Sequence, residues 1–382
     1  MEKDPAWLRW LAGVKTPEQS RIEALDVFKE LGSEQSLGPA GYEAFAVTYA
    51  IQFKRPVLES LSQVLGGTEH STLTSATQTL TSGEGNWWLA HLATAFEKNQ
   101  PKLADWAPRH QQMLTTLRTR AIAARSSIWL IGIAGLAFFP ITLRSLRSGL
   151  KTRLRGYSSA WLPSLGLATF FAATLAWIGF SMTLDLGLAN FNSIHPLLAL
   201  LLDSFARFLP AFIAIGLLFK RPTHSIRVLG INQPIHPGPV LGLFSLLLIL
   251  DQILNRLLGD FGTANPGGGL SLSDQGISGL VFLFISACIV APISEEILYR
   301  GVLFRSLGNR LGILPAAILS SLIFAVFHFY NLYGLCSVAI FGGTCALLYA
   351  GTGSLAAVIA LHALYNASIK IPEWIVYHSP LS

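Results

Sequence analysis

The stretch that decides the fold is residues 277–300, which read ISGLVFLFISACIVAPISEEILYR. Its first 17 residues contain no charged side chain, and two glutamates and an arginine follow within the next seven positions. A helix needs about 20 mainly apolar residues to cross the ~30 Å hydrocarbon core of a bilayer. An ionised side chain inside such a helix costs roughly 2.5–3.5 kcal/mol on insertion scales. The stretch therefore predicts a membrane-spanning helix whose charged residues have a specific role.

The rest of the chain beyond residue 125 has the same apolar character. Of the 382 residues, 52% are hydrophobic and 13% are charged, whereas about 25% are charged in an ordinary soluble domain. Eight apolar runs are candidates for spans, and they lie at 126–143, 159–182, 196–218, 237–258, 277–307, 312–330, 334–350 and 354–371. The run 237–258 is the weakest candidate, because Asp251 and Arg256 lie in its second half. We predict an all-α fold, a polytopic membrane helical bundle of about eight transmembrane helices over 126–371.

Residues 1–120 have the mixed composition of a soluble protein. Thr16 is followed by Pro17 and, three residues after the cap, by Gln19. This is the arrangement of an N-cap, a first-turn proline and a capping box, and it predicts a helix. We expect a small N-terminal helical soluble domain over 1–120. It contains no catalytic motif, so we expect a regulatory or docking unit that catalysis does not require.

The net charge of +6 comes from basic residues that flank the apolar runs. They do not form the basic stripe with interleaved aromatic residues that is typical of nucleic-acid binding, so no nucleic-acid partner is expected. The loop 144–155 carries five basic residues, and the loop 183–195 carries none. Because Lys and Arg accumulate in short cytoplasmic loops, we expect 144–155 to face the cytoplasm. The expected location is the cell membrane, with lipid around the bundle.

The two acidic residues of the opening stretch have different expected surroundings. Glu296 and Arg300 are four positions apart, so on a helix they are neighbours and can form an ion pair. Glu295 is rotated by roughly 100° from Glu296 at helical pitch, which allows it to face a polar cavity. An alternative is that both glutamates simply lie at the cytoplasmic interface.

Two of the nine histidines, His328 and His362, lie deep in apolar runs. His362 is four residues before Asn366, which places both side chains on one helix face. Each residue also has a purely structural interpretation. His328 can be satisfied by a packed neighbour, and His362 and Asn366 can form polar contacts between helices.

The depth of these groups in the membrane favours a shared site. We place the relevant turns at Gly308–Asn309 and at Gly351, and we count about 1.5 Å of rise per helical residue. Glu295, His328 and His362 then lie roughly 17–25 Å from the same side of the bundle. We therefore expect one pocket to collect all three clusters.

The three clusters also match three known motifs. The pattern Glu-Glu-x-x-x-Arg occurs at Glu295, Glu296 and Arg300, Phe-x-x-x-His at Phe324 and His328, and His-x-x-x-Asn at His362 and Asn366. In this order, and in apolar helices, they resemble the CPBP family, which groups CaaX prenyl proteases with bacteriocin-processing and self-immunity proteins. The resemblance covers about residues 200–371 as a protease core and leaves 1–120 unexplained.

The resemblance implies an intramembrane glutamic endopeptidase that needs no cofactor and no metal. Glu295 would be the general base that takes a proton from water, and His328 would hold the same water. His362 and Asn366 would donate hydrogen bonds to the oxyanion of the tetrahedral intermediate. The residues that would orient the site are Glu296, Arg300 and Phe324. The substrate would be a protein or peptide, with membrane-embedded and lipidated ones included.

Two other interpretations stay open. Glu295, His328 and His362 could supply three zinc ligands and leave an open position for water, although the chain has no His-Glu-x-x-His sequence and no paired cysteine spacing. The chain could also be a non-catalytic scaffold, an immunity protein or a transporter, because charged groups within spans mark transport pathways. We find no internal symmetry of the kind that transporters often have.

Overall fold

The computed structural model describes residues 22, 25, 26, 29, 107–153, 156–157, 160–187, 196–258, 276–328, 330, 332–377 and 379. Every regular element within these residues is helical, and the predicted all-α membrane bundle is confirmed. The chain divides into two compact units, residues 1–126 with 375–382, and residues 127–374. We call the second unit, 127–374, the membrane unit.

Most of the predicted N-terminal domain lies outside the described residues. The exceptions near the start are residues 22, 25, 26 and 29, which are helical, as the capping pattern at Thr16 predicts. Residues 107–120 belong to a helix that continues to Gly135. The role of the domain stays a prediction.

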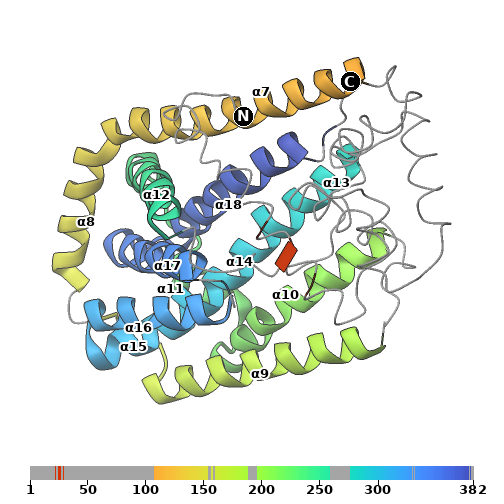
Figure 1. Ribbon diagram of the computed structural model, residues 1–382. Coiled ribbons are helices and arrows are strands. Elements are labelled where there is room, and N and C mark those ends of the chain that lie inside the picture. Colours follow the sequence, from red (N-terminus) through yellow and green to blue (C-terminus); the bar gives the residue numbers. More distant parts are fainter. Residues whose placement is uncertain are drawn as a thin grey trace. The chain divides into compact units, whose positions relative to one another are not determined.

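The helices are drawn in Figure 1. They contain most of each predicted apolar run, although the first run, 126–143, lies within a longer helical stretch from Ala107 to Arg153. They are α7 (Ala107–Gly135), η2 (Leu136–Phe138), α8 (Phe139–Arg153), α9 (Pro163–Gly187), α10 (Pro196–Leu218), α11 (Pro222–Leu229), α12 (Pro237–Leu258), α13 (Gly276–Leu283), η4 (Phe284–Val290), α14 (Ala291–Glu296), η5 (Ile297–Phe304), α15 (Arg305–Leu311), α16 (Ile313–Val326), α17 (Leu332–Thr352) and α18 (Leu355–Tyr377). Helices α9 to α12 each begin at a proline, whose fixed φ and missing N–H suit a first helical position.

Seven helices among the described residues are long and apolar enough to span a membrane. They are Thr115–Arg153, Pro163–Leu184, Leu200–Leu218, Pro237–Leu258, Ile277–Leu311, Leu332–Thr352 and Leu355–Val376. The remaining predicted run, 312–330, contains α16, which has only 14 residues. At 1.5 Å per residue it extends about 21 Å, which is shorter than the hydrocarbon core.

The charged residues of α12 are compensated by neighbours within the membrane unit. Tyr333 Oη and Ser337 Oγ donate hydrogen bonds to Asp251 Oδ1 at 2.9 and 2.7 Å. Arg256 lies over the ring of Trp129, with its guanidinium carbon 5.2 Å from the ring centre. Because buried polar groups are tolerated when they are paired, α12 can cross the membrane despite these charges.

The long helix from α13 to α15 positions the motif glutamates. It packs against α9, α10, α16 and α17. Its segment around Val302, Leu303 and Phe304 is at most 1% exposed, and it lies in the same core as Phe170 and Leu348. The side chains of this helix are therefore fixed by surrounding helices on several sides.

The turns that set residue depth lie two to four residues later than predicted. The helix does not end at Gly308–Asn309 but continues to Leu311, and Gly312 has φ +85°. Likewise α17 continues past Gly351 to Thr352, and Gly353 has φ +71°. Both turns need the left-handed conformation that glycine adopts without steric cost, and these later glycines supply it.

Several turns gather at one end of the membrane unit. Arg153 Nη1 donates to the carbonyl of Ala350 at 2.9 Å, which joins the end of α8 to the end of α17. Leu355 N donates to Gly230 O at 3.1 Å, which adds the end of α11. Tyr157 N donates to Asn309 Oδ1 at 2.7 Å, which adds α15. We call this the basic end, because the loops rich in Lys and Arg meet there.

Candidate active site

The glutamate pair lies on a short α-helical segment between two wide turns. α14 follows the π-helical η4 and precedes the π-helical η5. In η4, Ala291 N–H bonds to Ser286 O, five residues back. π-Helical turns are rare and are frequently found at functional sites.

Pro292 explains the local geometry. It has no N–H, and its ring would clash with the carbonyl of a normal α-helical turn. In the wider η4 pattern, each N–H donates to the carbonyl five residues back, so a residue with an N–H at position 292 would donate to Ala287 O. Asn366 Nδ2 on α18 donates to Ala287 O instead, at 2.7 Å. Asn366 therefore satisfies the carbonyl that Pro292 leaves open and fastens α18 to this helix.

Glu296 is fully buried, with 0% exposure. Its Oε1 accepts hydrogen bonds from Arg300 Nη1 and from His362 Nδ1, both at 2.7 Å. The expected Glu296–Arg300 contact is present, whereas the His362 contact was not expected. The second oxygen, Oε2, is buried and has no hydrogen-bond partner among the described residues. Glu296 is thus held in place on α14 by both η5 and α18.

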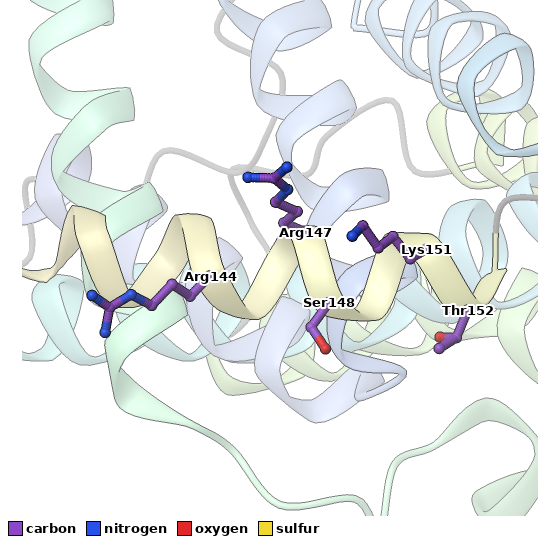
Figure 2. Close-up of a pocket in the computed structure, with 5 residues that line it drawn as sticks. All are labelled: Arg144, Arg147, Ser148, Lys151 and Thr152. Carbon is purple, nitrogen blue, oxygen red and sulfur yellow. The ribbon is translucent and has the colours of Figure 1, made fainter.

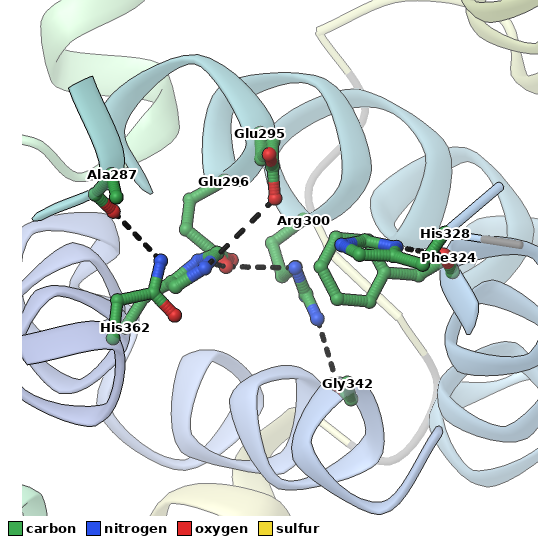
Figure 3. A network of polar contacts seen from close by, with 9 residues as sticks. Ala287, Glu295, Glu296, Arg300, Phe324, His328, Gly342 and His362 are labelled. Atoms are coloured by element: carbon green, nitrogen blue, oxygen red, sulfur yellow. Dashed lines mark hydrogen bonds and ion pairs between the residues drawn. The ribbon is translucent and has the colours of Figure 1, made fainter. Parts of the chain in front are cut away.

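Glu295 has different surroundings (Figure 3). Its side chain is 26% exposed, and its Oε2 lies 3.9 Å from His362 Nε2. His362 therefore lies between the two carboxylates, with Nδ1 toward Glu296 and Nε2 toward Glu295. The two neighbouring acids differ in exposure, since Glu296 is buried in the core and Glu295 is accessible. The rotation between successive helical residues predicts this difference.

Arg300 and Phe324 link the glutamates to α16 and α17. Arg300 Nη2 donates to Gly342 O at 3.2 Å, and its guanidinium carbon lies 4.4 Å from the centre of the Phe324 ring. The Phe324 ring is 4.5 Å from that of His328 and is 1% exposed. Phe324 is therefore the packing surface through which His328 meets the rest of the cluster.

His328 lies just beyond the end of α16. Its Nδ1 is 2.8 Å from Phe324 O. Since a carbonyl can only accept, Nδ1 is the donor, and in the neutral imidazole Nε2 then presents a lone pair. Among the described residues its ring also meets Tyr330, but neither glutamate. The structure thus brings Glu295, Glu296, Arg300 and His362 into direct contact and attaches His328 through Phe324.

A second polar group next to the site was missed by the sequence reasoning. Arg207 Nε bonds both oxygens of Asp203 at 3.0 and 2.9 Å, and Ser286 Oγ donates to Asp203 Oδ2 at 2.6 Å. Ser294 Oγ, next to Glu295 in sequence, donates to Arg207 O. Arg207 also interacts electrostatically with Glu295. The sequence does contain a signal for this group, because Asp203 and Arg207 are oppositely charged residues four positions apart within an apolar run.

Comparisons with known proteins relate the segment that carries this site to membrane peptidases. Residues 277–368, which contain all seven motif residues, match the family model described as type II CAAX prenyl endopeptidase Rce1-like. The match supports the resemblance of this segment to the CPBP family. The chain is also 33% identical over 97 residues to “Putative membrane peptidase YdiL” of Bacillus subtilis (strain 168). That match covers 25% of this chain and only 39% of the relative's length. No solved structure matches the chain.

Proposed function

We propose that this chain is an intramembrane endopeptidase of the cell membrane in which Glu295 activates water. The observation that supports this most is the difference between adjacent carboxylates. Glu296 is 0% exposed and bonded to Arg300 and His362, whereas the Glu295 side chain is 26% exposed and faces His362 Nε2. A carboxylate that is accessible, yet oriented by a fixed neighbour, suits a general base.

The proposed reaction begins when Glu295 takes a proton from a water molecule. The resulting hydroxide attacks the carbonyl carbon of the peptide bond, and the carbonyl oxygen becomes an oxyanion. The proton then passes to the amide nitrogen, and the C–N bond breaks to give a carboxylate and an amine. His328 assists by accepting a hydrogen bond from the same water at Nε2, the nitrogen that its contact with Phe324 O leaves free.

His362 has a further role in this proposal, because it connects both carboxylates. Its Nδ1 proton is directed to Glu296, so the imidazole orientation is fixed. Its Nε2 lies 3.9 Å from Glu295 Oε2. An imidazole beside the base can share the proton that Glu295 gains and stabilise the charge that forms.

We expected His362 and Asn366 to donate to the oxyanion, but His362 directs its Nδ1 to Glu296, so we propose other donors beside Asn366. Asn366 uses one of its two Nδ2 protons for Ala287 O, and a carboxamide has a second one. The amino groups of Arg207 have no hydrogen-bond partner among the described residues, because only its Nε is bonded to Asp203. Donors of this kind can stabilise the negative charge that develops on the substrate oxygen.

The substrate is proposed to be a protein or peptide that reaches the site within the membrane, lipidated ones included. The test is cleavage of reconstituted membrane peptides by purified protein in water enriched in oxygen-18. Hydrolysis predicts one heavy oxygen in each newly formed carboxyl terminus. Substrate that stays intact with wild-type protein, across a diverse membrane-peptide library, would favour the scaffold or transporter interpretation.

The zinc alternative is tested in the same assay. Among the described residues, no three His, Cys, Asp or Glu side chains gather as a metal-ligand group. If Glu295 alone activates the water, cleavage should persist at its full rate after dialysis against a strong chelator. Loss of cleavage that added zinc restores would establish the metal mechanism instead.

A further inference from the structure

Helix α8 has two contrasting faces. Its inner face contains the buried Thr142 and the half-buried Leu146 and Leu150, which pack toward the core. Its outer face has five exposed side chains that line an open hollow of about 440 Å³ (Figure 2). These are Arg144, Arg147, Ser148, Lys151 and Thr152.

The three cations of this hollow are available for a ligand. Arg144, Arg147 and Lys151 make no ion pair or hydrogen bond with any described residue. By contrast, Arg153 on the inner side of the same helix donates to the carbonyls of Ala350 and Gly351. The inward arginine is therefore a structural contact, whereas the outward cations are not neutralised by any residue that the structure describes.

No carboxylate of the described residues compensates this charge. Further cations lie at the basic end, namely Lys220 and Arg221 directly before α11, Arg227 in α11 and Arg310 in α15. The acidic residues whose side chains are described in the membrane unit lie elsewhere, in the interior of spans or toward the end of α18. They are Asp203, Asp251, Glu295, Glu296 and Glu373. An unbalanced positive surface at a membrane boundary attracts anions.

We propose that the α8 hollow binds the phosphate headgroup of an anionic phospholipid in the leaflet at the basic end. A lipid fits better than a free phosphate, because exposed apolar side chains directly precede the cations on the same helix. Ile141 and Leu143 are 54% and 56% exposed. An acyl chain can lie along these side chains while its headgroup contacts Arg144, Arg147 and the Ser148 hydroxyl. This proposal rests on the membrane fold and does not depend on the proposed protease activity.

The test is native mass spectrometry of the full chain in detergent, titrated with phosphatidylglycerol and with phosphatidylcholine of the same acyl chains. Wild type should retain phosphatidylglycerol preferentially. The triple variant Arg144→Gln, Arg147→Gln, Lys151→Gln should bind it at least ~10-fold more weakly, because it removes direct charge-assisted contacts to the phosphate, each of which contributes roughly 10-fold. Replacement by Arg144→Lys, Arg147→Lys, Lys151→Arg should keep most of the affinity, which separates charge from folding.

The matched control removes the same number of charges at the same end. Lys220→Gln, Arg221→Gln, Arg227→Gln should change phosphatidylglycerol binding by less than about 3-fold, since these side chains do not line the hollow. Equal losses in both triple variants, or equal retention of the two lipids by wild type, would overturn the proposal. Displacement of the lipid by soluble glycerol phosphate at equal concentration would also overturn it, in favour of a free-phosphate site.

Discussion

At the scale of single residues, the site separates two adjacent carboxylates by one helical step of rotation. Glu296 enters the core and is met by Arg300 and His362, each at 2.7 Å. Buried charges of this kind need both pairing and hydrogen bonds. Glu295 stays accessible because it points to a different side of the same helix. The chemical difference between them therefore follows from one local geometry.

Gly342 is a less obvious part of the same arrangement. Its carbonyl accepts a hydrogen bond from Arg300, and an added Cβ would lie 3.0 Å from Ser321 Cβ and 3.3 Å from Arg300 Nη2. We expect Gly342→Ala to destabilise the protein by about 1–3 kcal/mol through overpacking, despite the better helix propensity of alanine. Thermal unfolding in detergent measures this effect.

The matched control is the next residue, Gly343, where the nearest atom to an added Cβ is Ser321 Oγ at 3.8 Å. Gly343→Ala should leave stability unchanged or raise it by up to about 1 kcal/mol. If both variants unfold at the wild-type temperature, α17 does not pack closely against Arg300.

At the scale of elements, Pro292 and Asn366 act together. Asn366→Ala should leave Ala287 O unsatisfied and lower stability by about 1–3 kcal/mol. Pro292→Ala restores an N–H that can serve the same carbonyl, so in that background the stability loss from Asn366→Ala should shrink by at least about 1 kcal/mol. A double-mutant cycle of unfolding free energies measures this coupling.

The activity of the same four proteins distinguishes structure from catalysis. If Asn366 also donates to the oxyanion, Asn366→Ala should reduce cleavage by up to ~10²–10³ in both backgrounds. Stability losses that are identical in the wild-type and Pro292→Ala backgrounds would show that Asn366 does not complete this helix. Cleavage that Pro292→Ala restores would show that its role is only structural.

Sequence patterns predicted those parts of the site that depend on local spacing. The Glu296–Arg300 pair needs only a separation of four residues on a helix. The contact between His362 and Glu296 joins two residues that are 66 positions apart and lie on different helices. No local sequence pattern predicts such a contact. The glycine turns were misplaced because Gly308 and Gly351 resemble helix ends, although both lie within helices. The wide turns around α14 depend on how Pro292 is accommodated in three dimensions.

At the scale of the whole molecule, one end of the membrane unit collects the basic turns. The excess of Lys and Arg in these turns is the observation from which residues 144–155 were predicted to face the cytoplasm. A thiol-labelling experiment tests this orientation. In a background without Cys288, Cys336 and Cys345, Ser148→Cys is exposed and lies at the basic end. An impermeant thiol reagent added to intact cells should leave it unlabelled and should label it after lysis.

The control for orientation is Glu373→Cys, an exposed position near the end of α18. That helix leaves the basic end at Leu355, so its far end should be labelled from outside. Labelling of Ser148→Cys in intact cells, with Glu373→Cys protected, would invert the predicted orientation.

The central claim concerns Glu295 and is tested most directly by cleavage rates of purified Glu295→Gln and Glu296→Gln beside their unfolding curves. Glu295→Gln keeps the side-chain size but cannot take a proton, so it should lose ~10²–10⁴ in rate with an unchanged unfolding temperature. Glu296→Gln leaves Arg300 buried without its charge partner and should lose several kcal/mol of stability. A fully folded Glu295→Gln protein that cleaves at the wild-type rate would contradict the account.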